Sequence, residues 1–397
     1  MIKNNEKFRM VATTLFGLEQ VLAEELTELG AEEVNPQNRS VEFWGNKELL
    51  YKANLWSRLS IRILLPFKPF MIYTKDDFYQ NVMKIDWLSY INPEATMIID
   101  SIVNDSRIFN NSMFVSQLTK DAIVDQIREK TGKRPSIDLN NPDLRINVHI
   151  NKNKISISLD SSGEPLYKRG YRTETVLAPI NEVLAAGIIK LSGWDMKTNF
   201  VDAMCGSGTF AIEAAMMARK VAPGLFRKQF GFMLWKDYEP MIFKRLKRDA
   251  NNEIQPELPF KIIGSDISWD GIRYAKSNAI HALVDSNIRF EKKKFEEQNP
   301  PKSPGILIIN PPYDNRMPVE EIDVLYKSIG DTLKQKYEGY DAFVFTGNLE
   351  AAKSIGLRPS RKIALFNSSI ECKLLKYEIY KGAKKDKYNS DQGNEEI

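Results

Sequence analysis

The spacing of apolar residues along the chain changes twice, which divides it into three regions. In the first region, residues 1–69, short alternating stretches typical of strands are interleaved with apolar residues at helical spacing. Short elements in this order predict a small α/β sandwich. The predicted strands are residues 8–14, 39–44 and 60–66, and the predicted helices are residues 17–30 and 47–55.

The second region, residues 70–168, predicts another α/β unit. The polar residues Asn151 and Lys152 lie between two alternating stretches, as in a hairpin. Gly132 follows a helical pattern at the place where a glycine ends a helix. The predicted strands are residues 96–102, 144–150 and 154–159, and the predicted helix is residues 116–131.

The third region, residues 169–384, changes to a repeated order of strand and then helix. This order indicates a mostly parallel sheet covered by helices on both faces. Pro179 is expected in the first turn of the first helix, and the polar residues 385–397 predict a disordered tail. The predicted strands are residues 200–204, 261–265, 306–309, 341–345 and 362–366, and the predicted helices are residues 179–193, 209–218, 269–281 and 319–337.

Composition excludes several classes of protein. The 397 residues are 43% apolar and 27% charged, which is ordinary for a globular protein. No apolar run approaches the roughly 18 residues of a membrane span, and the first residues contain no apolar signal-peptide core. Two cysteines and two histidines, without HExxH or CxxC, predict neither a disulfide framework nor a metal site. We therefore expect a cytoplasmic protein without membrane or metal partners.

The net charge of +4 neither requires nor excludes nucleic acid. The distribution of basic residues is more informative, because they gather in short stretches at residues 130–134, 168–172 and 227–228. A single stretch of this kind is more often solvated surface than a binding site, so charge alone identifies no partner.

A candidate ligand site begins at residues 201–208 (VDAMCGSG), where an apolar strand leads through glycines into a helix. Gly206 and Gly208 allow a ligand to approach the backbone closely, and ligands of parallel sheets bind at the carboxyl ends of the strands. The same spacing also fits a dinucleotide fingerprint, or a tight turn without any ligand. Cys205 lies within this turn without a nearby base, so we expect a packing role for it and not that of a nucleophile.

The position of the next acidic residue separates these interpretations. A nicotinamide site has an acid roughly 20 residues after the glycines, but here the polar residues 220–259 occupy that distance. The next strand instead ends at Asp266, whose carboxylate could accept both ribose hydroxyls of a nucleoside. No lysine follows the glycines as it does in a phosphate-binding loop. The expected ligand is a nucleoside without phosphates, and S-adenosylmethionine is one.

A second motif, residues 310–313 (NPPY), directly follows the predicted strand 306–309. Two prolines stiffen this turn and donate no hydrogen bonds, which leaves the Asn310 side-chain oxygen and the Pro311 carbonyl as acceptors. Two acceptors suit a planar exocyclic amine, and Tyr313 offers a ring on which a base could stack. A proline-rich turn without catalytic meaning is the alternative.

At these motifs the chain resembles class I methyltransferases that act on exocyclic amines. More narrowly, it resembles the THUMP-containing 23S rRNA guanine-N2 methyltransferases, and this resemblance extends over about residues 8–381. The matching segments are residues 161–172 (SSGEPLYKRGYR), 178–194 (APINEVLAAGIIKLSGW), 202–208, 264–267 and 310–313.

The resemblance implies a Rossmann-like class I methyltransferase domain with a mostly parallel seven-stranded sheet at residues 169–384. It also implies a ferredoxin-like subdomain at residues 1–69 and an RNA-binding THUMP domain at residues 70–168. The residues that it implies for the catalytic turn are Asn310, Pro311, Pro312 and Tyr313. Those that it implies for S-adenosylmethionine are Ala178, Pro179, Glu182, Asp202, Met204, Gly206, Gly208, Asp266 and Ile267. Candidate RNA contacts in the basic stretches are Lys133, Arg134, Lys168, Arg169 and Arg172.

One position departs from the family pattern. Many relatives have an acid shortly after the third strand, where it can meet the adenine amine, but here Lys294 stands at about that place. Glu296 or a backbone group is the expected substitute.

The function expected from the resemblance is methylation of a guanine N2 amine in 23S rRNA. A tRNA guanine-N2 methyltransferase shares nearly every motif and remains an alternative. An adenine-N6 DNA methyltransferase or a glutamine protein methyltransferase would also use an NPPY turn, but the THUMP-like region argues against both. A non-catalytic RNA-binding assembly factor is a further alternative, against which Asp266 and the NPPY motif argue.

Overall fold

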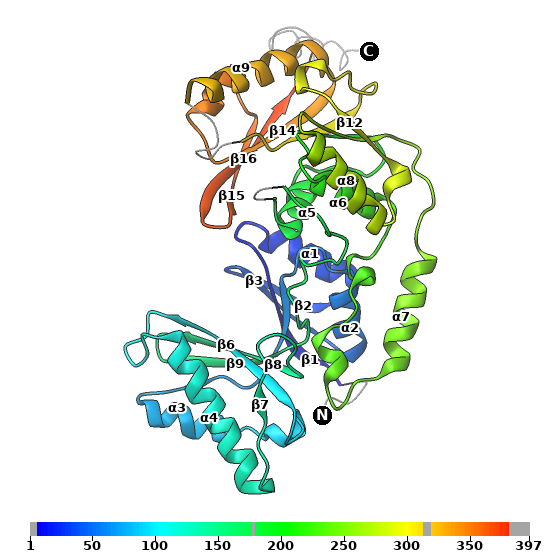
Figure 1. Cartoon of the computed structure of the whole chain (residues 1–397). Coiled ribbons are helices and arrows are strands. Elements are labelled where there is room, and N and C mark those ends of the chain that lie inside the picture. Colours follow the sequence, from blue (N-terminus) through cyan, green and yellow to red (C-terminus); the bar gives the residue numbers. More distant parts are fainter. Residues whose placement is uncertain (1–5, 177–178, 313–318, 381–397) are drawn as a thin grey trace, which may run out of the picture. The chain divides into compact units, whose positions relative to one another are not determined.

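The computed structural model describes residues 6–176, 179–312 and 319–380, and its chain divides into two compact units (Figure 1). The first unit comprises Met1–Gly170 together with Ala222–Glu253, and the second comprises Tyr171–Val221 with Ile254–Ile397. The segment Ala222–Glu253, called the inserted segment below, therefore leaves the second unit and returns to the first.

The first unit contains a nine-stranded sheet with the order β2-β3-β1-β4-β9-β8-β6-β7, and β5 also pairs with β9. Strands β4 and β9 pair antiparallel, with Leu64 opposite Asp160. One sheet thus continues across the boundary predicted near Pro69. The strands are β1 (Phe8–Thr13), β2 (Glu32–Gln37), β3 (Ser40–Gly45), β4 (Arg62–Pro66), β5 (Phe70–Met71), β6 (Thr96–Asn104), β7 (Ser136–Ile137), β8 (Leu144–Asn151) and β9 (Lys154–Asp160).

Local sequence signals set the ends of several helices in this unit. The Asn46 side chain accepts a hydrogen bond from the N–H of Leu49 at the start of α2, and Gly132 ends α4 with a left-handed φ of 72°, as predicted. Helix α4 packs against β6 and α3 (Figure 1). The helices are α1 (Glu19–Leu29), α2 (Lys47–Trp56), α3 (Lys75–Met83), α4 (Ser112–Thr131) and α7 (Pro240–Asn252), of which α3 and α7 had not been predicted.

The second unit contains the predicted seven-stranded sheet, with the order β12-β11-β10-β13-β14-β16-β15. Its first five strands are parallel, and β16 and β15 are antiparallel to their neighbours. This arrangement confirms the class I methyltransferase fold. The strands are β10 (Asn199–Ala203), β11 (Ile262–Asp266), β12 (Ile288–Lys292), β13 (Gly305–Ile309), β14 (Tyr340–Thr346), β15 (Arg361–Asn367) and β16 (Ile370–Glu378).

One predicted helix start in this unit was wrong. The helix begins at Glu182 and not at Pro179, because the side chain of Asn181 accepts hydrogen bonds from the N–H groups of Val183 and Leu184. The helices are α5 (Glu182–Leu191), α6 (Thr209–Ala218), α8 (Trp269–His281) and α9 (Val319–Lys336).

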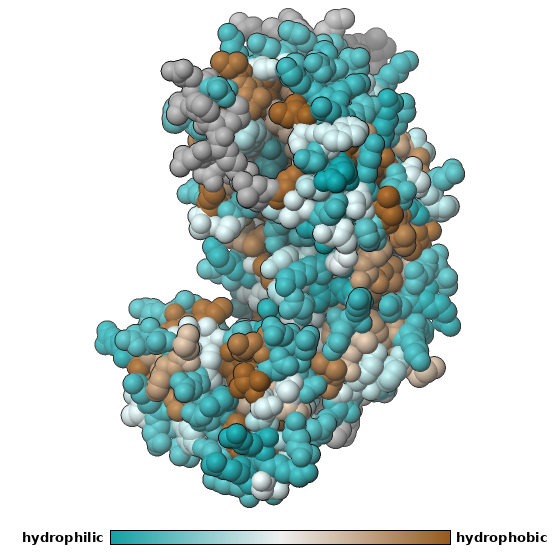
Figure 2. Space-filling model, in the orientation of Figure 1, coloured by the Kyte–Doolittle hydropathy of each residue, from teal (hydrophilic) through white to brown (hydrophobic). Residues whose placement is uncertain are grey.

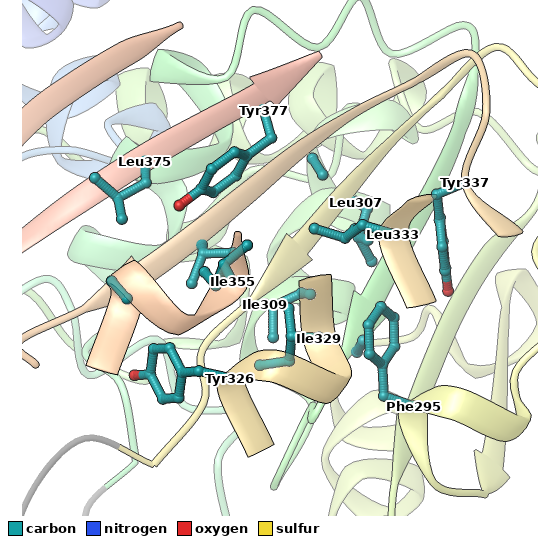
Figure 3. Packing of buried hydrophobic residues seen from close by; sticks show 14 of the residues in the cluster. Phe295, Leu307, Ile309, Tyr326, Ile329, Leu333, Tyr337, Ile355, Leu375 and Tyr377 are labelled. Carbon is teal, nitrogen blue, oxygen red and sulfur yellow. The ribbon is translucent and has the colours of Figure 1, made fainter. Parts of the chain in front are cut away.

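Alternate residues of β10 face opposite sides of the sheet. Val201 and Ala203 join a core with Leu307 and Ile309 beneath α9 (Figure 3). Asp202 faces the other way, toward α6, and accepts a hydrogen bond from its Ala211 N–H. Each fully buried Leu or Ile of this core contributes roughly 1.5–3 kcal/mol. The cluster on one face and the Asp202 hydrogen bond on the other thus hold β10 against α9 and α6.

Among the described residues, no helix is long and apolar enough to cross a membrane. Hydrophilic side chains cover most of the face shown in Figure 2, and apolar ones are scattered among them.

Candidate active site

A pocket of about 420 Å³ lies at the carboxyl ends of β10, β11, β12 and β13 in the second unit. Parallel sheets bind ligands at this edge. The strand ends contribute Met204, Cys205, Gly206, Ser207, Asp266, Ile267, Lys293, Lys294, Phe295, Glu296, Asn310, Pro311 and Pro312, and other segments contribute Val176, Pro179, Ile180, Thr209, Phe210, Leu325 and Asn367. The structure thus brings the glycine turn, the acid of the next strand and the first three residues of NPPY into one pocket.

The two glycines of the turn have different tasks. Gly206 lines the pocket and has a left-handed φ of 52°. Gly208 has a φ of 82°, and a Cβ there would lie 2.9 Å from Ala275 Cβ and 3.1 Å from the Phe290 ring. Gly208 therefore lets the turn pack closely on its neighbours, whereas Gly206 keeps the backbone open to a ligand.

Asp266 connects the turn to the end of β11. One carboxylate oxygen accepts a hydrogen bond from the Gly206 N–H at 2.8 Å, and the other accepts one from the Ser268 N–H at 2.8 Å. A carboxylate has about four lone-pair sites. Asp266 therefore holds the backbone of the turn and keeps capacity to accept hydrogen bonds from a ligand in the pocket.

Asp202 lies behind the pocket and not in its lining. It is fully buried, and burial raises the pKa of its carboxyl well above its usual range. One oxygen accepts a hydrogen bond from Ala211 N–H at 3.1 Å, and the other has no hydrogen-bond partner among the residues that the structure describes. The geometry gives Asp202 the task of joining β10 to the start of α6.

Glu182 also lies outside the pocket lining, although the resemblance implied a contact with the ligand. Its carboxylate pairs with Arg172 Nε at 2.9 Å. Arg172 donates further hydrogen bonds to the Ile180 carbonyl and to Thr209 Oγ1, both at 3.0 Å. Arg172 therefore connects three segments around the pocket.

Asn310 brings a buried hydrogen-bond acceptor to the pocket. Its Oδ1 atom is buried, lines the pocket with Pro311 and Pro312, and has no hydrogen-bond partner within the described parts of the chain. An unsatisfied buried acceptor costs about 1–3 kcal/mol, so a ligand that donates a hydrogen bond would remove this cost. Two further residues of the predicted site, Ala178 and Tyr313, lie outside the described residues.

The sequence motifs did not identify all of the pocket lining. Phe295 follows β12, and Asn367 ends β15, which is remote from the glycine turn in sequence. Lys294 and Glu296 both line the pocket, as their place after the third strand suggests. Cys205 also lines it but is only 8% exposed, and burial raises the pKa of its thiol well above the usual range, which disfavours a nucleophilic thiolate.

The predicted RNA contacts of the first unit fall into two groups. Arg169 is only 1% exposed, and its guanidinium donates to the carbonyls of Leu166 at 2.9 Å and Arg58 at 2.6 Å, so it does not face solvent. Lys133, Arg134 and Lys168 are exposed. Lys133 pairs with Glu94 at 3.0 Å and Lys168 pairs with Glu164, and both contacts are at the surface, where such pairs are weak.

Three family models match the chain. Residues 169–376 match the RMKL-like methyltransferase domain, residues 9–64 match the RlmL ferredoxin-like domain, and residues 73–160 match the THUMP domain. These matches agree with the order of domains implied by the sequence motifs.

Individual relatives are similar over nearly the whole chain. A protein named as an RNA methyltransferase (slr0064) from Synechocystis is 41% identical over 93% of this chain and 96% of its own. The ribosomal RNA large subunit methyltransferase K/L of Syntrophotalea carbinolica is 40% identical over 94% of this chain but 53% of its own, so the chain spans about half the length of that relative. The structure of SMU.472, named as a methyltransferase and complexed with SAH, has a TM-score of 0.85 and 30% identity, and covers 95% of this chain and 100% of its own.

Proposed function

Because the chain belongs to the family of RMKL-like methyltransferases with a THUMP domain, we propose that it methylates the exocyclic N2 amine of a guanine in 23S rRNA with S-adenosylmethionine as cofactor. The observation that carries this proposal is the buried Oδ1 of Asn310, which has no hydrogen-bond partner among the described residues and belongs to the same pocket as Asp266. The relatives named as large subunit rRNA methyltransferases support rRNA as the substrate.

The pocket fits S-adenosylmethionine at several points. Asp266 would accept hydrogen bonds from the ribose hydroxyls, and Gly206 leaves room for the ligand beside the backbone. Met204, Ile267 and Pro179 would supply the apolar walls. When bound, the cofactor supplies an activated methyl group on a sulfonium, so that the protein needs no nucleophile of its own.

The adenine amine needs an acceptor, and the ammonium group of Lys294 only donates. Glu296 also lines the pocket, and its carboxylate is the acceptor that we assign to this task. Glu296→Gln would keep one acceptor oxygen and is therefore expected to bind the cofactor better than Glu296→Ala does.

The protein acts on the guanine by positioning it. Asn310 Oδ1 would accept one hydrogen from the N2 amine, and the Pro311 carbonyl would accept the other. These bonds would turn the nitrogen lone pair toward the methyl donor. Asn310 removes no proton, and the amine proton leaves to water after transfer. Tyr313 is proposed as the stacking partner of the base.

The remaining residues of the proposed site act through other groups. Asp202 and Gly208 would hold the glycine turn in shape, and Glu182 would act through Arg172. Exposed Lys133, Arg134 and Lys168 are proposed to meet RNA phosphates. We propose domain boundaries at residues 69, 168 and 384, and a reducing cytoplasmic location.

The proposal is tested by transfer of labelled methyl from S-adenosylmethionine to protein-free large-subunit rRNA, tRNA and DNA, followed by digestion to nucleosides. We expect labelled N2-methylguanosine from rRNA. Label in tRNA alone would favour the tRNA alternative, and label in DNA adenine would favour the DNA alternative. Cofactor binding without transfer to any of these substrates would favour an assembly factor.

A further inference from the structure

The inserted segment is built into the first unit by buried polar contacts. Arg227 is 8% exposed, and its Nη1 donates to the carbonyls of Pro165 and Lys168, both at 2.8 Å. Its Nη2 donates to the carbonyls of Ser162 at 3.1 Å and Glu164 at 2.8 Å. This guanidinium thus binds four carbonyls of the loop at residues 162–168 and fixes the start of the inserted segment on that loop.

The rest of the segment packs on α2. Buried Lys47 donates to the Asp237 carbonyl at 2.8 Å and pairs with Glu239 at 3.1 Å. The ring of Tyr51 stacks on Phe232 with 4.3 Å between centroids, and Phe243 of α7 meets Phe232 edge-on at 5.2 Å. These contacts cover the apolar face of α7 and fix the rotation of this helix about its axis.

The outer face of α7 is basic. Met241, Lys244, Arg245 and Arg248, which we call the α7 stripe, follow the helical spacing i, i+3, i+4, i+7 and line a shallow surface hollow with Ile242. Met241 is 75% exposed and the Arg248 side chain is 70% exposed.

The acidic groups beside the stripe neutralise it only in part. Arg245 pairs with Glu48 of α2 at 2.6 Å, and Arg248 contacts its chain neighbour Asp249 at 3.2 Å. Both pairs are about half exposed or more, so they exchange readily with other anions. Lys244 and Arg248 stand one helical turn apart, about 6 Å along the axis, and present two cations to solvent on a fixed surface.

We propose that the α7 stripe is a second RNA-binding surface, which holds the phosphate backbone of the substrate through Lys244 and Arg248. The geometry fits RNA because two exposed cations on a rigid helix match a run of phosphates, and guanidinium forks bind phosphate oxygens in pairs. The α7 stripe then adds phosphate contacts to those of the THUMP domain. It belongs to the inserted segment, which packs in the first unit although the stretches of chain before and after it belong to the second. This inference rests on the proposed function, because it names a contact of the same RNA substrate.

The test compares the full chain with the double variant Lys244→Gln/Arg248→Gln in binding to a structured transcript of large-subunit rRNA. We expect roughly tenfold weaker binding at low salt, and a slope of log affinity against log salt that is smaller by about 2, since each lost phosphate contact removes about 1. The KM for RNA should rise while kcat at saturating RNA stays the same, because the stripe lies outside the pocket.

A matched control is Arg273→Gln/Lys276→Gln, which removes the same charge from exposed positions of α8. If both double variants lose affinity equally, net charge explains the effect and the proposal is overturned. Unchanged affinity and salt slope in the α7 variant would overturn it as well. If the wild-type chain binds the transcript but methylates no rRNA, the proposed function fails, while the binding comparison still decides the role of α7.

Discussion

The pocket of the second unit and the inserted segment of the first differ in how they use buried polar groups. In the pocket, Asn310 Oδ1 has no partner among the described residues. In the inserted segment, Arg227 donates to four carbonyl oxygens, and only its Nε lacks a partner within the described chain. Asn310 begins the NPPY turn, and Arg227 belongs to the basic pair at residues 227–228.

The difference shows what separates a binding group from a structural one. A buried polar atom without a partner destabilises the protein, and where that atom belongs to the wall of a pocket a ligand can supply the partner. A buried cation that donates to several backbone carbonyls is not accessible to phosphate, and its loss should affect folding. Four substitutions test this distinction.

The largest effect is expected at Arg227. Arg227→Ala removes a donor from four carbonyl oxygens, although the Pro165 carbonyl keeps its hydrogen bond from the Lys168 N–H at 3.0 Å. A buried acceptor that loses its donor costs about 1–3 kcal/mol, and we expect at least about 3 kcal/mol of lost stability. The measurement is the urea unfolding midpoint of the full chain. Lys228→Ala, at the exposed neighbour, should change it little. Equal effects of the two substitutions would show that Arg227 is not a structural anchor.

Asn310→Ala should affect turnover and leave folding intact. Its acceptor matters most when the amine nitrogen gains positive character, so the methyl-transfer rate should fall by about 100-fold or more, comparable with loss of one oxyanion-hole donor. Affinity for S-adenosylmethionine and for RNA should stay nearly constant. Single-turnover transfer with separate binding assays measures this, and Asn299→Ala at an exposed site is the control. If Asn310→Ala transferred methyl at the wild-type rate, the NPPY motif would have no catalytic role.

Asp266→Ala should weaken cofactor binding by about 1.5–3 kcal/mol, the range for hydrogen bonds to a charged group. Calorimetric titration with S-adenosylmethionine measures the change. Asp270→Ala removes an exposed acid four residues further on, which pairs with Arg273 at the surface, and should leave the affinity unchanged. If Asp266→Ala binds as tightly as the wild type, the carboxylate is not part of the cofactor site.

The smallest effect is expected for Asp202→Asn. Because burial raises the pKa of Asp202 in the folded state, its contribution to stability is present at acid pH and is lost as pH rises above the usual carboxyl range. Asparagine can still accept from Ala211 N–H but does not titrate. The variant should therefore gain stability relative to the wild type from pH 4 to pH 8, by a few degrees in Tm at most. A Tm difference that is independent of pH would contradict the assignment.

Much of the second unit could be predicted because its information is local. Apolar strands such as β13 lead directly into Asn310, and Asp266 is the last residue of β11, so strand ends and site residues were found together. Strands β12 and β16 were missed as parts of the sheet because charged residues interrupt their apolar pattern. Pro179 lies before α5 and not in its first turn, because the helix begins after its N-cap residue, Asn181.

The first unit was harder to predict because its decisive contacts are distant in sequence. Arg169 reaches the carbonyl of Arg58, and Arg227 reaches a loop more than 50 residues away, so no local pattern shows that these cations are buried. Helix α7 was missed because only Phe243, Leu246 and Ala250 of it are buried, within a stretch that is otherwise polar.

The most direct test of the central claim is nucleoside mass spectrometry of rRNA and tRNA from a strain that lacks this protein, compared with the parent strain. We expect the deletion strain to lose one N2-methylguanosine from large-subunit rRNA. The modification should return when the wild-type chain is supplied and should not return with Asn310→Ala. An unchanged N2-methylguanosine content of that rRNA, or a loss confined to tRNA, would contradict it.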